Sequence, residues 1–256
     1  MQRFNDKVVI VTGGGSGIGA ATCERFASEG AAVVIAEINS ESGRAVAERI
    51  AARGQRALFS QTDVADEDSV RRMVSRTVAA WGRIDVLVNN AAVFVFKGVD
   101  ASVDAWRQVL DVNVMGPALV AKHVVPELRK AGGGAIVNLG SISSFIAQPQ
   151  FVTYNTSKAA IANMTRCLAL DLAPDNIRVN AVCPGTVWTP IVERLTRDAG
   201  LDRAAADRDP AWGGSHMIQR IAEPREIAAA IAFLASDDAS FITAECLMVD
   251  GGYVAK

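Results

Sequence analysis

Short runs of hydrophobic, often β-branched residues alternate along the chain with longer stretches in which hydrophobic positions recur every three or four residues. Most of the short runs are apolar along their whole length, which is typical of parallel strands covered on both faces. They predict strands at residues 7–12, 32–37, 57–61, 84–89, 134–139, 177–182 and 247–249. The longer stretches predict helices at residues 17–29, 41–53, 66–81, 103–129, 151–172 and 224–234, the fourth with Ser102 as its N-cap.

This alternation of strands and helices predicts an α/β fold, a doubly wound parallel sheet of about seven strands with helices on both faces. With 256 residues, half of them hydrophobic, the chain is expected to form one domain over residues 1–256. Only the stretch at about 189–222 is irregular, being charged and alanine-rich, then glycine-rich. Ligands bind beyond the carboxyl ends of strands in such sheets, so this stretch is either a substrate-binding lid or a surface insertion.

A glycine-rich turn follows the first strand and leads into the first helix, with glycines at 13, 17 and 19. Glycine lets the main chain adopt positive φ and approach a pyrophosphate, while the helix start presents free N–H groups to phosphate. Glu37 ends the second strand, where an acid accepts hydrogen bonds from the adenosine ribose. A 2′-phosphate would be repelled by about 1–4 kcal/mol, and Ser16 stands where a basic residue could offset this. The pattern therefore predicts NAD rather than NADP.

Tyr154 and Lys158 stand four residues apart, on one face of a predicted helix. A phenol titrates near pH ~10, and a neighbouring cation favours the phenolate and lowers that pKa. The pair therefore predicts a proton-transfer site, although the same spacing occurs in ordinary half-buried helices. Ser141 lies thirteen positions before Tyr154, with Ser143 and Ser144 as competing hydroxyls.

Composition narrows the classes of function. The net charge of −2 gives no reason to expect nucleic acid or an anionic membrane surface, and no apolar run is long enough to span a bilayer. No His, Cys and carboxylate residues have metal-ligand spacing, so no metal is expected. The scattered cysteines Cys23, Cys167, Cys183 and Cys246 are interpreted as reduced core thiols of a cytoplasmic protein.

Taken together, these motifs resemble the short-chain dehydrogenase/reductase family over essentially the whole chain. The matching positions are Thr12, Gly13, Gly17, Gly19, Asn89, Asn90, Ala91, Asn113, Ser141, Tyr154, Lys158, Pro184, Gly185, Thr189 and 249–252. The resemblance implies a Rossmann-type sheet of seven strands, an NAD-dependent enzyme acting on CH–OH groups, and assembly as a homotetramer. Two positions depart from the family pattern, because Ala92 and Ala244 replace glycines usual there.

By the same resemblance, Asn113, Ser141, Tyr154 and Lys158 form the catalytic set. Tyr154 would be the general base in oxidation, Lys158 would stabilise its phenolate, and Ser141 would bind the substrate oxygen. Asn113 would hold a water that passes the proton to solvent. The implied cofactor contacts are Gly13, Ser16, Gly17, Ile18, Gly19, Glu37, Asp63, Val64, Asn89, Ala91, Tyr154, Lys158, Pro184, Gly185, Val187 and Thr189.

Aromatic side chains with a few polar groups are expected around the substrate, which fits a small or medium alcohol. The predicted substrate contacts are Ser141, Ser143, Gln148, Phe151, Tyr154 and Trp188, within a wider set that adds Phe94, Phe96, Gln150, Ile191, His216 and Met217. His216 either hydrogen-bonds a substrate hydroxyl or faces solvent, whereas packing is expected for Ile191 and Met217. Residues 146–150 and 187–190 resemble the L-fucose dehydrogenase branch and suggest a sugar or polyol.

Three functions remain open at this point. The first is an NAD-dependent dehydrogenase of a sugar, polyol or similar secondary alcohol. The second is a carbonyl reductase of the 3-oxoacyl-carrier-protein type, whose usual NADPH the acidic Glu37 disfavours. The third is a non-catalytic NAD-binding regulator, which an intact catalytic set makes improbable.

Overall fold

A computed structural model of the protein describes residues 2–256, which form one seven-stranded sheet with the order β3-β2-β1-β4-β5-β6-β7. All neighbouring strands are parallel. The strands are β1 Val8–Thr12, β2 Ala32–Glu37, β3 Ala57–Gln61, β4 Val86–Asn89, β5 Gly134–Leu139, β6 Ile177–Pro184 and β7 Cys246–Val249. The predicted strands are therefore confirmed, with ends that differ by at most two residues.

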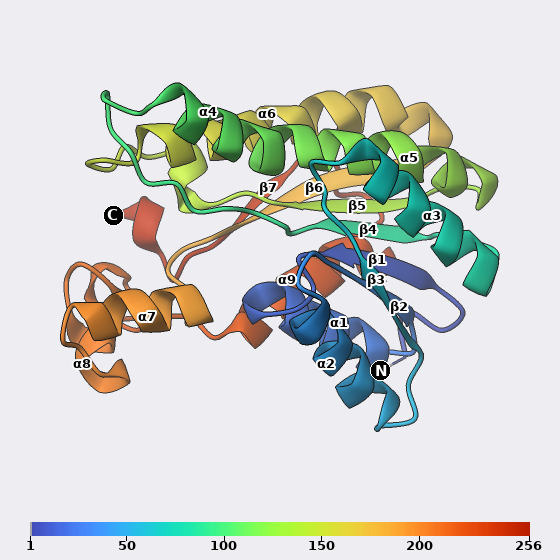
Figure 1. Cartoon of the computed structure of the whole chain (residues 1–256), viewed down its shortest axis with the longest axis horizontal. Coiled ribbons are helices and arrows are strands. Elements are labelled where there is room, and N and C mark those ends of the chain that lie inside the picture. Colours follow the sequence, from blue (N-terminus) through green and yellow to red (C-terminus); the bar gives the residue numbers. More distant parts are fainter. Residues whose placement is uncertain (1) are drawn as a thin grey trace.

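Helices cover both faces of this sheet (Figure 1), as predicted. They are α1 Gly17–Ser28, α2 Ser40–Ala51, α3 Glu67–Trp81, α4 Val103–Leu110, α5 Gly116–Lys130, α6 Val152–Leu172, α7 Pro190–Asp198, α8 Arg203–Arg208 and α9 Pro224–Ala235. The cluster of buried side chains on one face includes residues of α1, α2 and α9, and the cluster on the other includes residues of α3, α5 and α6.

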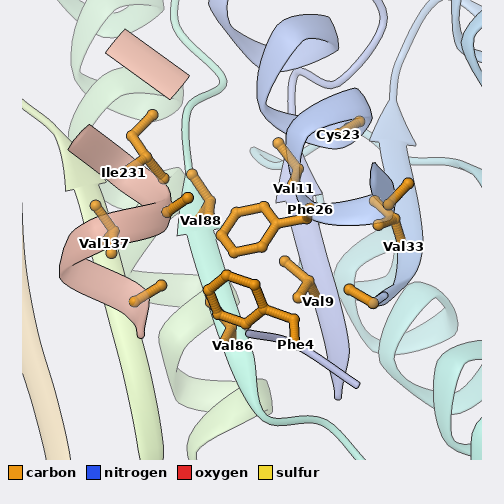
Figure 2. Close-up of a cluster of buried hydrophobic side chains, with 14 of the residues drawn as sticks. Phe4, Val9, Val11, Cys23, Phe26, Val33, Val86, Val88, Val137 and Ile231 are labelled. Atoms are coloured by element: carbon orange, nitrogen blue, oxygen red, sulfur yellow. The ribbon is translucent and has the colours of Figure 1, made fainter. Parts of the chain in front are cut away.

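Strand β1 shows why the strands are apolar at every position. Val9 and Val11 point into the core beneath α1 and α9, whereas Ile10 points into the opposite core. Figure 2 shows the first of these cores, where the rings of Phe4 and Phe26 meet edge to face with centroids 4.7 Å apart. A strand buried on both faces has no solvent side, and for that reason its sequence lacks alternation.

The single helix predicted at residues 103–129 is interrupted, which corrects the prediction. Ser102 caps α4 as expected, its hydroxyl accepting from the Ala105 N–H at 3.2 Å. A π-helical turn, Asp111–Met115, then separates α4 from α5. Such a turn inserts one residue into a helix and is frequent at functional sites. Here it contains Asn113.

The stretch at 189–222 is more regular than expected, because it contains α7, α8 and a 3-10 turn, Gly213–Ser215. These elements lie apart from the two helical layers, beyond the end of β6 (Figure 1). Arg203 fastens α8 to its surroundings, because its guanidinium stacks on Trp188 at 4.6 Å and pairs with Asp207 and Glu223. The expectation of irregular backbone is wrong here.

Two expectations from composition can be compared with the fold. Within residues 2–256, no helix has both the length and the hydropathy that a bilayer crossing requires. The four cysteines are free thiols, and Cys23 and Cys183 are buried. Cys167 is exposed on α6, so describing all four as core thiols is wrong for this residue.

Candidate functional site

A cavity of about 650 Å³ lies at the carboxyl ends of the strands, where the loops after β1, β2, β4, β5 and β6 meet. Parallel strands direct these loops to one edge of the sheet, as in other doubly wound folds. Most residues predicted to contact a cofactor or substrate line the cavity. They are Gly13, Ser16, Gly17, Ile18, Gly19, Glu37, Asp63, Val64, Ala91, Ser141, Ser143, Gln148, Phe151, Tyr154, Lys158, Pro184, Gly185, Val187 and Thr189.

The glycine-rich turn forms one end of the cavity. Gly13 and Gly17 have φ of 63° and 51°, in the left-handed region that favours glycine. A Cβ at Gly19 would overlap the carbonyl oxygen of Gly13, so only glycine allows the start of α1 to lie this close to the turn. The turn therefore leaves main-chain N–H groups at the cavity edge.

Glu37 is held beside this turn by two main-chain N–H groups. Its Oε2 accepts from Gly15 at 3.1 Å and its Oε1 accepts from Asn39 at 3.0 Å. The carboxylate is therefore fixed at the cavity wall. Together, the open glycine turn, the helix start and the anchored acid fit the diphosphate and adenosine ribose of a dinucleotide.

At the centre of the cavity, Tyr154 lies in the first turn of α6 and Lys158 one turn later, both almost fully buried. The Lys158 Nζ donates to the carbonyl oxygen of Leu139 at 2.7 Å and lies 5.8 Å from the centroid of the Tyr154 ring. The Ser141 Oγ accepts the Ser143 N–H at 3.1 Å, which orients the serine toward the phenol.

Burial dominates the titration of this pair. It raises the pKa of the Tyr154 phenol, and the hydrogen bond with the Ser141 side chain only partly opposes the rise. Burial also lowers the pKa of Lys158 to about 8. The lowered phenol pKa expected from the sequence is therefore wrong for this structure, because burial outweighs any effect of Lys158, whose ammonium donates to the Leu139 carbonyl.

Asn113 lies behind this centre rather than on the cavity wall. Its Oδ1 accepts the Val93 N–H at 2.8 Å, and its Nδ2 donates to the Val93 carbonyl at 3.0 Å and to the Ser157 Oγ at 3.2 Å. Both amide atoms are thus engaged. The side chain ties the π-helical turn to the strand-end loop that carries Phe94 and Phe96.

Aromatic rings form the end of the cavity beyond Tyr154. Phe94 stacks on the Tyr154 ring at 5.4 Å, and Phe96 stacks on Phe151 at 4.3 Å. The polar groups here are few, and the Ser143 hydroxyl donates to the Gln148 Oε1 at 2.8 Å. Ile191, Val192, Leu195, Ala211 and Trp212, from the 189–222 stretch, complete the wall.

Several predicted residues lie away from the cavity wall. Asn89 is buried in the sheet, where its Nδ2 donates to the Asn138 Oδ1 at 2.9 Å. Trp188 stacks with Arg203 and is absent from the wall, whereas Trp212 lines it. Gln150, His216 and Met217 are also absent from the wall.

Among the wall residues that the sequence did not predict, Asn90 and Trp212 are the most informative. Asn90 donates to the carbonyls of Thr12 and Gly13 at 2.9 and 3.0 Å and so supports the glycine turn. Asn90 belongs to one of the family motifs, and this position could have indicated its role in the sequence. Trp212 stood in the glycine-rich stretch with no pattern to mark it.

A cavity that extends from a glycine-rich helix start to a buried tyrosine–lysine pair is the site expected of a nicotinamide-dependent oxidoreductase. The family model that matches residues 13–254 is described as enoyl-(acyl carrier protein) reductase. The chain is 44% identical over 256 residues to cis-4-hydroxycyclohexanecarboxylate dehydrogenase of Sinomonas cyclohexanicum, with 99% of both chains covered. It is 40% identical over 257 residues to cyclopentanol dehydrogenase of Comamonas testosteroni, with 100% of both covered.

A more distant relative, dehydrogenase/reductase SDR family member 4 of Pongo abelii, is 37% identical over 249 residues, with 96% of this chain and 87% of that one covered. The chain belongs to the short-chain dehydrogenase/reductase family. It is an oxidoreductase that acts on CH–OH groups with a nicotinamide cofactor.

Proposed function

We propose that the protein is an NAD(H)-dependent dehydrogenase that interconverts a compact secondary alcohol and its ketone. The observation that carries this proposal is the burial of Tyr154, with Ser141 and Lys158, between a dinucleotide end and an aromatic end of one cavity. When bound, the nicotinamide supplies the carbon that accepts the hydride, and with it two electrons, from the carbinol carbon.

Each residue of the set has one task in this proposal. Tyr154 takes the proton of the alcohol hydroxyl during oxidation and returns it during reduction. Ser141 donates its hydroxyl hydrogen to the substrate oxygen, since its lone pair already accepts from Ser143. Lys158 supplies the neighbouring cation that favours the phenolate. Both amide atoms of Asn113 are engaged, so a proton-relaying water at this residue would bind its main-chain carbonyl.

The fixed carboxylate of Glu37 supports NAD as the cofactor. A 2′-phosphate placed within ~4 Å of it would be repelled by about 1–4 kcal/mol, which corresponds to roughly tenfold to several-hundredfold discrimination. Glu37→Gln keeps the size of the side chain and removes its charge. This variant should raise kcat/KM for NADP⁺ relative to NAD⁺ by at least about tenfold. Glu41→Gln, which removes an exposed charge nearby, should leave the ratio unchanged.

The substrate end supports a cyclic, uncharged alcohol. Its walls are aromatic and aliphatic, and the charged side chains lining the cavity within residues 2–256 are Glu37, Asp63 and Lys158. A substrate carboxylate would find no cation except the one engaged in proton transfer. The relatives named for cyclopentanol and for a hydroxycyclohexanecarboxylate support a ring as the carrier of the hydroxyl. Polar groups are few at this end of the cavity, which disfavours the sugar or polyol suggested by the L-fucose dehydrogenase-like segments.

The deciding experiment is an NAD⁺ reduction assay with cyclopentanol, cyclohexanol, cis-4-hydroxycyclohexanecarboxylate and L-fucose. Cyclopentanol or cyclohexanol should give the highest kcat/KM, about tenfold or more above the carboxylate, because a buried unpaired charge is costly. Preference for L-fucose would restore the sugar hypothesis. Tyr154→Phe should reduce turnover by about 10²–10⁴-fold while NADH still binds.

Other outcomes separate the remaining functions. Tighter binding of NADPH than NADH, with activity on 3-oxoacyl thioesters, would favour the carrier-protein type of reductase. NADH binding without turnover of any alcohol or ketone would favour a non-catalytic regulator.

A mobile lid at 189–222 is part of the same proposal, and the wall residues that α7 supplies support it. Hydrogen exchange of this segment, measured with and without NADH, tests it.

Assembly and location belong to the same proposal. Exposed apolar side chains on α6 and before β7, among them Leu170 and Phe241, support a homotetramer. Leu170→Arg and Phe241→Asp should each lower the mass measured by light scattering without unfolding the chain. Free thiols at all four cysteines support a cytoplasmic location.

A further inference from the structure

We propose that His216 is a positioning residue that fastens the cofactor-side loop, residues 184–189, to the segment that closes the substrate end of the cavity. The proposal rests on the proposed function only in taking this loop as the nicotinamide side of the site. It assigns to His216 neither of the two tasks suggested by the sequence, because the side chain neither lines the cavity nor faces solvent.

Both ring nitrogens of His216 have main-chain partners. The Nε2 lies 3.1 Å from the Thr186 nitrogen, whose N–H donates to it. The Nδ1 lies 3.2 Å from the Gly213 carbonyl oxygen. An amide N–H can only donate and a carbonyl can only accept, so Nε2 carries no proton and Nδ1 does. The contacts therefore define one neutral tautomer of this imidazole.

The imidazole ring of His216 also packs closely against Gly185, Gly251 and Tyr253. A Cβ on Gly185 would lie 2.6 Å from the His216 Nε2, and one on Gly251 would lie 3.3 Å from the His216 Cβ. The Tyr253 ring closes the third side, with its centroid 5.4 Å away at 61°. Two glycines and an aromatic ring thus allow the imidazole to reach the main chain of the loop, and 3% of the residue is exposed.

The two partners of His216 belong to different walls of the cavity. Gly185 and Thr186 line it on the cofactor side, while Gly213 directly follows the wall residue Trp212. A second connection lies nearby, since the Ala222 N–H donates to the Thr186 carbonyl at 3.0 Å and the Trp188 N–H donates to Ala222 at 2.8 Å. Without His216, the Thr186 carbonyl would remain fixed, whereas the Thr186 N–H would lose its one acceptor among residues 2–256.

This arrangement couples the two walls. The imidazole bonds to Thr186 of the loop and to Gly213 beside the wall residue Trp212 at the same time, so a shift of either segment on ligand binding is transmitted to the other. Because coupling between two binding events is reciprocal, His216 should contribute to the affinity for NADH and to the KM for the alcohol.

The test compares His216→Gln and His216→Leu with a control, His123→Leu, which changes the other of the two histidines. The His123 Nε2 lies 2.8 Å from Glu67, away from the cavity wall. A glutamine carbonyl can accept from Thr186, so His216→Gln should bind NADH within about threefold of the wild type. His216→Leu leaves a buried N–H without an acceptor and should weaken NADH binding about tenfold to a hundredfold, with a smaller change in kcat. His123→Leu should bind as the wild type does.

Equal NADH affinity in His216→Leu and the wild type would overturn the proposal, and so would an equal loss in His123→Leu. If His216→Leu does not fold, two other measurements still test the role proposed for His216. Nitrogen NMR of labelled histidine in the wild type should show the proton of His216 on Nδ1, and a proton on Nε2 refutes the proposal. A folded His216→Gln that loses more than about tenfold in affinity also refutes it. Failure of the wild type to bind NADH would count against the proposed function, whereas the tautomer is measured independently of it.

Discussion

Tyr154 and Lys158 are both buried on one face of α6, and burial shifts their pKa values in opposite directions. Burial lowers the pKa of Lys158 to about 8 and raises that of the phenol, so the lysine is the first of the two to lose a proton. A neutral lysine beside a phenol has the same net charge as an ammonium beside a phenolate. The pair can therefore accept a substrate proton once one proton has left it.

The pH dependence of the two reaction directions follows. Alcohol oxidation needs the singly deprotonated pair, so kcat/KM should rise up to about tenfold per pH unit below pH 8 and level off above it. Ketone reduction needs the proton, so its kcat/KM should be level below pH 8 and fall above it. Steady-state rates from about pH 6 to 10 measure both profiles. Oxidation that does not change over this range would contradict the assignment.

Ala244 is strained where the family pattern has glycine. Its φ of 62° is in the left-handed region, which costs a side chain with a Cβ about 1–2 kcal/mol. Ala244→Gly should raise the free energy of unfolding by about 0.5–1 kcal/mol, since part of the gain is offset by the greater freedom of glycine in the unfolded chain. Urea denaturation measures the change. The control Ala230→Gly, inside α9, should lower stability by about 1 kcal/mol.

At this scale, motifs predicted which residues line the cavity but not where each side chain points. Tyr154, Ser141 and Glu37 stand at motif spacings, and all three reach the cavity. Trp188 is directed away by its stacking with Arg203, a partner in α8 that no local pattern indicates. The contacts of His216 could not be predicted from the sequence for the same reason, because its partners are main-chain atoms that only the fold brings together.

Among the elements, the π-helical turn between α4 and α5 has the clearest functional consequence. It places the Asn113 amide against both main-chain polar atoms of Val93, as a neighbouring strand would. The hydrophobic periodicity on its two sides predicted a continuous helix, since the residue inserted by a π-helical turn has no sequence signal of its own. Strand positions were easier to predict, because burial on both faces leaves an unmistakable apolar run.

Removing the Asn113 amide tests this element. Asn113→Ala removes the side-chain partner of the partly buried N–H and carbonyl of Val93, which should lower the free energy of unfolding by about 1–2 kcal/mol. The loop that carries Phe94 and Phe96 loses its support, so the KM for the alcohol should rise more than the KM for NAD⁺. Urea denaturation and initial rates measure the two effects. Asn163→Ala, on the exposed side of α6, should change neither.

For the whole molecule, stability depends on two cores that share one sheet. In the first core, Phe26 is fully buried against Phe4 and the valines of β1 and β4 (Figure 2). Phe26→Ala should cost about 3–5 kcal/mol, because the surrounding side chains are attached to rigid elements and cannot fill the space. Chemical denaturation measures this loss, and Val99→Ala, at a fully exposed position, should stay within about 0.5 kcal/mol of the wild type.

The packing of α9 on α1 also has a consequence for the newly made chain. Helix α1 begins at Gly17, yet Ile227 and Ile231 of α9 complete the core around its Phe26. A ribosome releases the chain from its N-terminus, so the apolar side of α1 stays uncovered until α9 has also been synthesised. Nascent chains with such exposed surface aggregate readily. The newly made chain is therefore most vulnerable to aggregation before α9 emerges, and the uncovered side of α1 is the surface that chaperones would protect.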